Sequence, residues 1–331
     1  MPILPIRIAG QDAWISLLVG AAGIHLVIWI MYGIMNRCRT DLIHLHRQLF
    51  GRWAGDGLNL LFLLYFLFLA VHHTRVYIEI VQVWLFPDLI VWPLAIVLLL
   101  LTYYIVSGGF RVVVGICAFS LITQVLALTL LFSAPYLQYR NLTPIFDHSL
   151  SEIAMAAKQT TFSYMGVELL LFYFTYIKTP ERSQAWAHAG IAATTITYFL
   201  TVLFSLLLFK PQQLAKEIWP VLTKFNFVRF PFFERFEFMG ASAHVLRMLP
   251  IVCLCLWAAS RIMKAVSGMR QMTALPLLLS AVFTAVCLIP GRSADQAMNK
   301  ALSEIGFYLL YGYIPFLYVV QFVRRKRGNA A

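Results

Sequence analysis

The feature that most constrains this chain is a series of apolar stretches, each close to the thickness of a lipid bilayer. Read in windows of about 19 residues, they predict nine membrane spans, near residues 13–35, 57–85, 88–106, 110–134, 159–177, 185–209, 241–264, 273–290 and 301–323. A transmembrane helix needs about 20 apolar residues. The alternation of apolar and polar residues that is typical of a membrane β-barrel is missing from the sequence. The sequence therefore predicts an all-α polytopic membrane protein.

The composition supports this class. Of the 331 residues, 61% are hydrophobic and only 12% are charged, a balance that water-soluble domains do not have. No cleavable signal peptide is recognisable, so the first apolar stretch is expected to stay in the protein. The five cysteines lie mostly within apolar stretches and are interpreted as small core residues, with no metal site and no disulfide framework.

The net charge of +12 is explained by membrane orientation. No module with clustered aromatic and basic residues indicates nucleic-acid binding. If the spans alternate, more than half of the 26 lysines and arginines fall on one side, which the positive-inside rule assigns to the cytoplasm. These residues are Arg37, Arg39, Arg47, Arg52, Arg111, Lys178, Arg182, Arg261, Lys264, Arg270, Arg324, Arg325, Lys326 and Arg327. The basic tail, residues 324–331, is then cytoplasmic.

The whole chain, residues 1–331, is interpreted as a single integral membrane domain. Residues 37–55 are predicted to contain a short helix in the inner interface, because Thr40 or Asp41 can cap a helix there and an apolar stripe follows at helical spacing. That stripe consists of Leu42, Leu45 and Leu49. His44 and His46 are two residues apart and are poor joint metal ligands, so a solvated basic face is expected. Two longer loops, 135–158 and 210–240, are expected on the outer membrane surface.

The segment from Thr160 to Phe172 combines an apolar span with Gly166 and Glu168. Counted from the outer end of its span, Glu168 lies about 14 Å deep, near the middle of a hydrocarbon core about 30 Å thick. The helix is weakest at Ser163 and Gly166. Tyr164, Glu168 and Thr175 are expected to share one helical face.

Two interpretations of this segment remain open. A helix that is interrupted in mid-membrane exposes backbone groups that transporters use to hold small ionic substrates, and acids at this depth are commonly functional. Alternatively, Gly166 is a close-packing position and Glu168 is a protonated structural carboxyl.

A second polar cluster lies in the outer half of the 57–85 span. His72, Arg75 and Glu79 occur at positions i, i+3 and i+7 and share a face. An Arg75–Glu79 pair would lower the cost of placing both charges in a membrane. The cluster is interpreted either as the lining of an outward-facing vestibule or as a structural ion pair.

No catalytic constellation is recognisable. The sequence contains no serine, histidine and aspartate arrangement that spacing supports, no phosphate-binding glycine-rich loop and no histidine and glutamate metal motif. The chain is therefore predicted not to be an enzyme and to have no cofactor.

Six segments follow one another in the order and spacing of a known family. They are "AGQDAWIS" (9–16), "DLIHLHRQLFGRWAG" (41–55), "SGGFRVVVG" (107–115), "NLTPIFD" (141–147), "FSYMGVELLLF" (162–172) and "RFPFFERFEF" (229–238). In these the chain resembles the B subunit of spore germinant receptors, a family of the amino acid–polyamine–organocation transporter superfamily. The resemblance covers nearly the whole chain.

The resemblance implies a transporter-like fold of ten helices in two inverted repeats. It implies a site for a small-molecule germinant, often an amino acid, near breaks in helices 1 and 6. Carried over by position, the interrupted helix 6 contains Ser163, Tyr164, Gly166 and Glu168, and Arg75 and Glu79 fall in the helix 3 region. The implied partners are the receptor's A and C subunits and the lipid bilayer of the spore inner membrane.

The chain departs from the family pattern at its N-terminus. "AGQDAWIS" follows helix 1 in the family, so residues 1–12 are interpreted as a remnant of that helix, and nine full spans are predicted in place of ten. The functions that remain open are a germinant receptor subunit, an ion-coupled secondary transporter of an amino acid or polyamine, and a membrane scaffold without a ligand.

Overall fold

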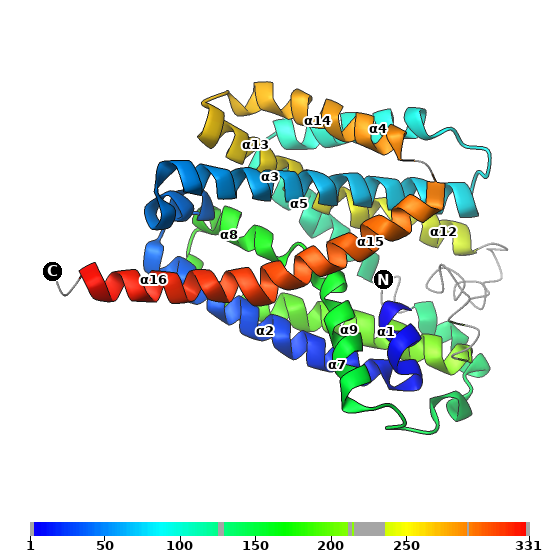
Figure 1. Cartoon of the computed structure of the whole chain (residues 1–331). Helices are drawn as coiled ribbons and strands as arrows, with labels where there is room; N and C mark the ends of the chain where they lie inside the picture. The colour runs from blue at the N-terminus through cyan, green and yellow to red at the C-terminus, as the bar shows by residue number, and fades with distance from the viewer. Residues whose placement is uncertain (1–2, 125–128, 211–213, 215–235, 290, 329–331) are drawn as a thin grey trace.

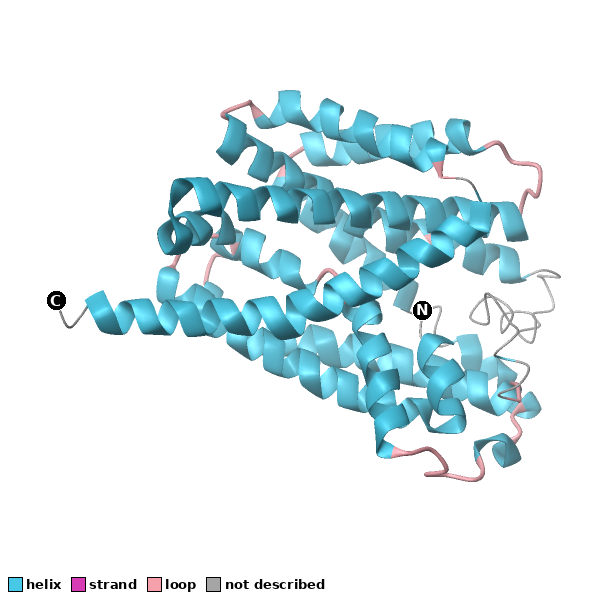
Figure 2. Cartoon of the chain, viewed as in Figure 1, coloured by secondary structure: helices cyan, strands magenta, loops and turns pink. Residues whose placement is uncertain are grey.

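The computed structural model describes residues 3–124, 129–210, 214, 236–289 and 291–328 (Figure 1). Within these ranges every regular element is a helix, as Figure 2 shows. The predicted all-α class is therefore confirmed for the described part of the chain. The predicted 210–240 loop and the last family segment, 229–238, lie largely outside the described residues.

Six segments of the described chain are long and apolar enough to cross a membrane, by length and composition. They contain α2 (Ala13–Cys38), α3 (Leu42–Trp84), α9 (Gln184–Leu208), α13 (Val245–Ser267), α14 (Gln271–Leu288), and α15 (Gly291–Phe307) continued by α16 (Ile314–Gly328). Three shorter apolar helical segments, Val91–Ser107, Phe110–Thr123 and Val167–Tyr176, lie at the remaining predicted spans. The nine-span count and the inverted repeat stay predictions.

Helices α3 and α13 form the centre of the fold. Helix α13 contacts α3, α14, α4 (Val91–Ser107) and α5 (Phe110–Ser120). On the opposite side of the view in Figure 1, α2 lies against α9 and against α7 (Leu150–Thr160). Helices α15 and α16 pass between these two groups and contact α3 and α2, respectively. The segment that carries Glu168, residues 167–173, contacts both α3 and α13.

The predicted capped helix after the first span is present. Asp41 caps α3 by accepting a hydrogen bond from the backbone N–H of His44 at 3.1 Å, and Leu42, Leu45 and Leu49 are all buried. Gly51 then interrupts the helix with φ 81° and ψ 175°. This left-handed φ suits glycine, which has no Cβ. Residues 42–50 therefore form a short helix that is separated by a turn from the long part of α3.

The prediction of a solvated face for both histidines is wrong for His46, which is fully buried. Its Nδ1 lies 2.7 Å from Asn59 Oδ1, and its Nε2 lies 2.8 Å from the hydroxyl of Tyr313. The turn at Gly51 folds the short helix back onto α3, and Tyr313 comes from the π-helical turn between α15 and α16. His44 remains largely exposed. His46 is therefore buried by Tyr313, a residue far away in sequence, which the pattern of residues 41–55 could not reveal.

Helix α7 begins at Leu150, nine residues before the predicted start of its span. Ser149 and Glu152 form a reciprocal capping box at its N-terminus. Before it, 3-10 turns cover Thr129–Tyr136 and Tyr139–Leu142. Both carboxylate oxygens of Asp12 accept backbone N–H groups from residues 146–148. This contact joins two of the family-like segments, "AGQDAWIS" and "NLTPIFD", beside α1 (Ile3–Ala9).

Candidate functional site: the interrupted helix

The predicted weak point of the 159–177 span is a break in the helix. Helix α7 continues into a 3-10 turn, Thr161–Tyr164, and the next residue, Met165, is extended. Gly166 follows with φ +103°, and a second 3-10 turn, Val167–Leu169, leads into α8 (Leu170–Tyr173) and a third turn, Phe174–Tyr176. A Cβ on Gly166 would lie 3.3 Å from Cδ1 of Ile251. Both the backbone angle and the space therefore favour glycine here.

The side chain of Glu168 bonds to the backbone at this break. Its side chain is fully buried. The backbone N–H of Gly166 donates to both carboxyl oxygens, at 3.0 and 2.9 Å, and the hydroxyl of Tyr65 on α3 donates to Oε1 at 2.7 Å. The carboxyl thus satisfies an N–H group that the break releases from helical bonding. It also attaches the interrupted segment to α3.

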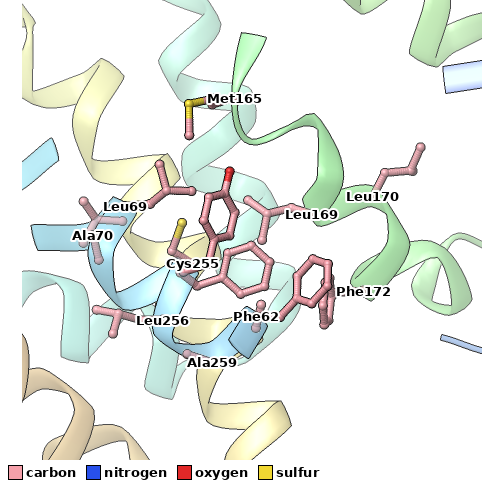
Figure 3. Packing of buried hydrophobic residues seen from close by; sticks show 14 of the residues in the cluster. Phe62, Leu69, Ala70, Met165, Leu169, Leu170, Phe172, Cys255, Leu256 and Ala259 are labelled. Atoms are coloured by element: carbon pink, nitrogen blue, oxygen red, sulfur yellow. The ribbon is translucent and has the colours of Figure 1, made fainter. Parts of the chain in front are cut away.

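Buried apolar side chains pack together where the interrupted segment meets α3 and α13. Figure 3 shows Leu169 and Phe172, from the interrupted segment, beside Phe62 and Leu69 of α3. The ring of Phe172 lies 5.5 Å from that of Phe62, centroid to centroid. Cys255 and Leu256 of α13 lie in the same cluster (Figure 3). In such surroundings water cannot replace Tyr65 and Gly166 as hydrogen-bond partners, so the carboxyl depends on the protein for its polar contacts.

Ser163 and Tyr164, just before the break, contact a different helix. The hydroxyl of Tyr164 lies 2.9 Å from Oγ1 of Thr195 on α9, and the hydroxyl of Tyr198 donates to the carbonyl oxygen of Ser163 at 3.0 Å. The expectation that Tyr164 and Glu168 share a face is therefore wrong. The backbone turns at Met165 and Gly166, so the side chain of Tyr164 points to α9 and that of Glu168 points to α3.

The ion pair that the structure gives Arg75 is with Asp295 of α15. Nη2 lies 3.2 Å from Oδ2, Nε lies 3.4 Å from Oδ1, and both residues are at most 3% exposed. Arg75 is therefore linked to a residue 220 positions away in sequence, whereas one of the two interpretations of the sequence pairs it with Glu79, four residues along. Glu79 has an interaction of its own.

Sequence reasoning missed Tyr65 and Asp295. Tyr65 lies in an aromatic run, "LLYFLF", where one tyrosine resembles a packing residue. Asp295 is an acid near the start of the last apolar segment, Ala294–Arg324. An acid in such a segment needs a partner, and this is the sequence signal that could have identified it. The described residues contain no group of three or more His, Cys, Asp or Glu side chains arranged to hold a metal ion.

Comparison with known proteins identifies the family. A family profile described as "Spore germination protein" matches residues 2–295. Spore germination protein GerQB of Bacillus cereus is 37% identical over 321 residues, which cover 97% of this chain and 89% of that protein. Spore germination proteins YndE and A2 of Bacillus subtilis (strain 168) are each 22% identical, over 96% and 82% of this chain and over 89% and 76% of their own lengths. With its long apolar helices and this family match, the chain is an integral membrane protein that belongs to the spore germination protein family.

Proposed function

We propose that the chain is the membrane subunit of a spore germinant receptor and that it senses a small germinant, an amino acid, at the interrupted helix. The observation that carries this proposal is the break at Gly166, which is held by a buried carboxyl and lies between α3 and α9. A helix that serves only for packing can be continuous, whereas a binding site that uses free backbone groups and a charge requires an interrupted helix. Family membership supplies the role in germination.

The geometry also suggests how binding is transmitted. Glu168 holds one side of the break to α3, and Ser163 and Tyr164 hold the other side to α9. A germinant that binds one arrangement of these contacts more tightly than another shifts the equilibrium between them. The A and C subunits of the receptor are the proposed partners that read out the change.

A secondary transporter is the second candidate, because a buried carboxyl at a helix break would also serve a coupled proton or cation. Uptake of a labelled amino acid by the purified chain in lipid vesicles, driven by an ion gradient, would favour this function over a receptor.

The receptor function is tested by germination of spores from a strain that lacks the gene for this chain and is complemented with it. Spores are exposed to a panel of amino acids, sugars and nucleosides, and germination is followed as loss of optical density. Restoration of a response to one or more amino acids is expected. A complemented strain that expresses the chain in the spore membrane but responds as the deletion strain does to every compound would refute the proposal.

We further propose a cytoplasmic C-terminus, because the basic residues concentrate on the side where α16 ends. Helix α16 extends to Gly328 and carries the basic run that begins at Arg324. Two topology reporters are fused after Arg327, one that is active only in the cytoplasm and one that is active only outside the membrane. Only the cytoplasmic reporter is expected to be active. An extracytoplasmic signal from the same fusion would reverse the orientation.

Glu168→Gln is expected to raise the germinant concentration for half-maximal response by about tenfold or more, the equivalent of about 1.4 kcal/mol, while the protein reaches the membrane in normal amount. Glutamine has nearly the same shape, and its oxygen can accept from Tyr65 and Gly166, so packing is retained. The negative charge is lost. Dose–response curves and immunoblots from the same spores provide the measurement. An unchanged half-maximal concentration would instead identify Glu168 as a protonated structural group.

A further inference from the structure

One face of α3 carries the contacts that frame the site. Tyr65, Leu69, His72 and Arg75 follow at intervals of four, three and three residues, so their side chains form one stripe. At its inner end Tyr65 is bonded to Glu168, and at its outer end Arg75 is bonded to Asp295. His72 lies between these two anchors, about 10 Å along the helix from Tyr65 and about 5 Å from Arg75.

His72 is buried and incompletely bonded. It is 2% exposed, and its Nδ1 has no hydrogen-bond partner within the described part of the chain. The other fully buried histidine provides a comparison, because both ring nitrogens of His46 have partners. A buried polar atom without a partner costs stability, and native structures contain few of them. A donor that binds at Nδ1 would remove this cost.

The ring of His72 also contacts the interrupted segment. It lies edge-on to the ring of Phe162, with centroids 5.6 Å apart and an interplanar angle of 75°. Phe162 belongs to the 3-10 turn that ends at the break, four residues before Gly166. A molecule that binds at His72 would therefore touch both α3 and the turn that leads to the break.

We propose that Nδ1 of His72 is a hydrogen-bond acceptor for the germinant, and that the ligand is a small polar molecule that presents an N–H or O–H donor. The inference rests on the proposed receptor function and specifies its binding chemistry. A neutral imidazole accepts a hydrogen bond through one of its two ring nitrogens. The ammonium group of an amino acid is a donor of the required kind.

Two substitutions separate acceptor chemistry from packing. His72→Phe keeps an aromatic ring against Phe162 but has no acceptor, whereas His72→Asn places an amide oxygen near the position of Nδ1. For the panel compound to which the wild-type chain responds, with L-alanine tested first, His72→Phe is expected to raise the half-maximal concentration at least about tenfold. His72→Asn is expected to respond more nearly as the wild type does. His44→Phe, the same change at a largely exposed histidine, is the control and is expected to leave the response unchanged.

Stability supplies an independent readout. His72→Phe removes an unpaired polar atom from the interior, so the thermal unfolding midpoint of the detergent-purified chain is expected to stay equal or to rise while the response weakens. An unchanged response together with a higher midpoint would show that His72 is only a packing defect. If His72→Phe does not reach the membrane, His72→Gln replaces it, because its oxygen lies nearer the position of Nε2. Equal responses of the Asn and Gln variants would then overturn the proposal.

The same strains distinguish failure of this inference from failure of the proposed function. If the wild-type chain restores germination and Glu168→Gln impairs it, but His72→Phe does not, only the role of His72 is refuted. If the wild-type chain restores no response, the receptor function itself is refuted.

Discussion

Gly166→Leu is expected to abolish the germinant response at concentrations that saturate the wild-type chain. At φ +103° a residue with a Cβ is strained by about 1–3 kcal/mol, and the new side chain would meet Ile251, whose Cδ1 already lies 3.3 Å from an added Cβ. Overpacking of this kind costs a further ~1–3 kcal/mol. If the backbone shifts to relieve either strain, the N–H group of residue 166 moves away from the carboxyl of Glu168, to which it donates. The response and the amount of protein are measured in the same spores.

Gly190→Leu is the matched control for this prediction. Gly190 lies in α9, and an added Cβ there meets no atom within 4 Å. The substitution introduces the same side chain without strain and is expected to preserve both the response and the protein amount. Gly166→Leu spores that germinate as Gly190→Leu spores do would show that the break is not needed for sensing.

Asp295→Asn is expected to destabilise the protein by about 3–5 kcal/mol, because it leaves the guanidinium of Arg75 buried without its counter-charge. The pair joins α3 to α15, and both side chains are at most 4% exposed. The measurement is thermal unfolding of the detergent-purified chain, compared with wild type. A double variant, Arg75→Leu with Asp295→Leu, removes both charges and is expected to recover much of the loss.

An exposed pair in the same chain serves as the control. Arg39 and Glu181 lie 3.5 Å apart, with side chains 81% and 67% exposed. Surface pairs contribute about 0–1 kcal/mol, so Glu181→Gln is expected to change the unfolding midpoint little. Equal midpoints for Asp295→Asn and Glu181→Gln would contradict a structural role for the buried pair and would favour a vestibule that water reaches.

The parts of this protein that could be predicted are those that depend on neighbouring residues. Hydropathy is additive along the chain, so the apolar stretches coincide with helices. The cap was narrowed to Thr40 or Asp41, and the structure assigns it to Asp41, because a cap bonds within its own first turn. The break at Gly166 was one of two interpretations open from local sequence, since glycine weakens a helix and an acid in an apolar span is costly without a partner.

Tertiary structure alone decided which partners these residues have. Glu168 is bonded to Tyr65, 103 positions away, and Arg75 to Asp295, 220 positions away. His46 is buried because a turn at Gly51 brings it against Asn59 and Tyr313. The physical reason is that a buried polar group needs a partner, but the amino-acid type specifies only the kind of partner. Its identity is set by which helices the fold places side by side, and periodicity along the chain does not contain that information.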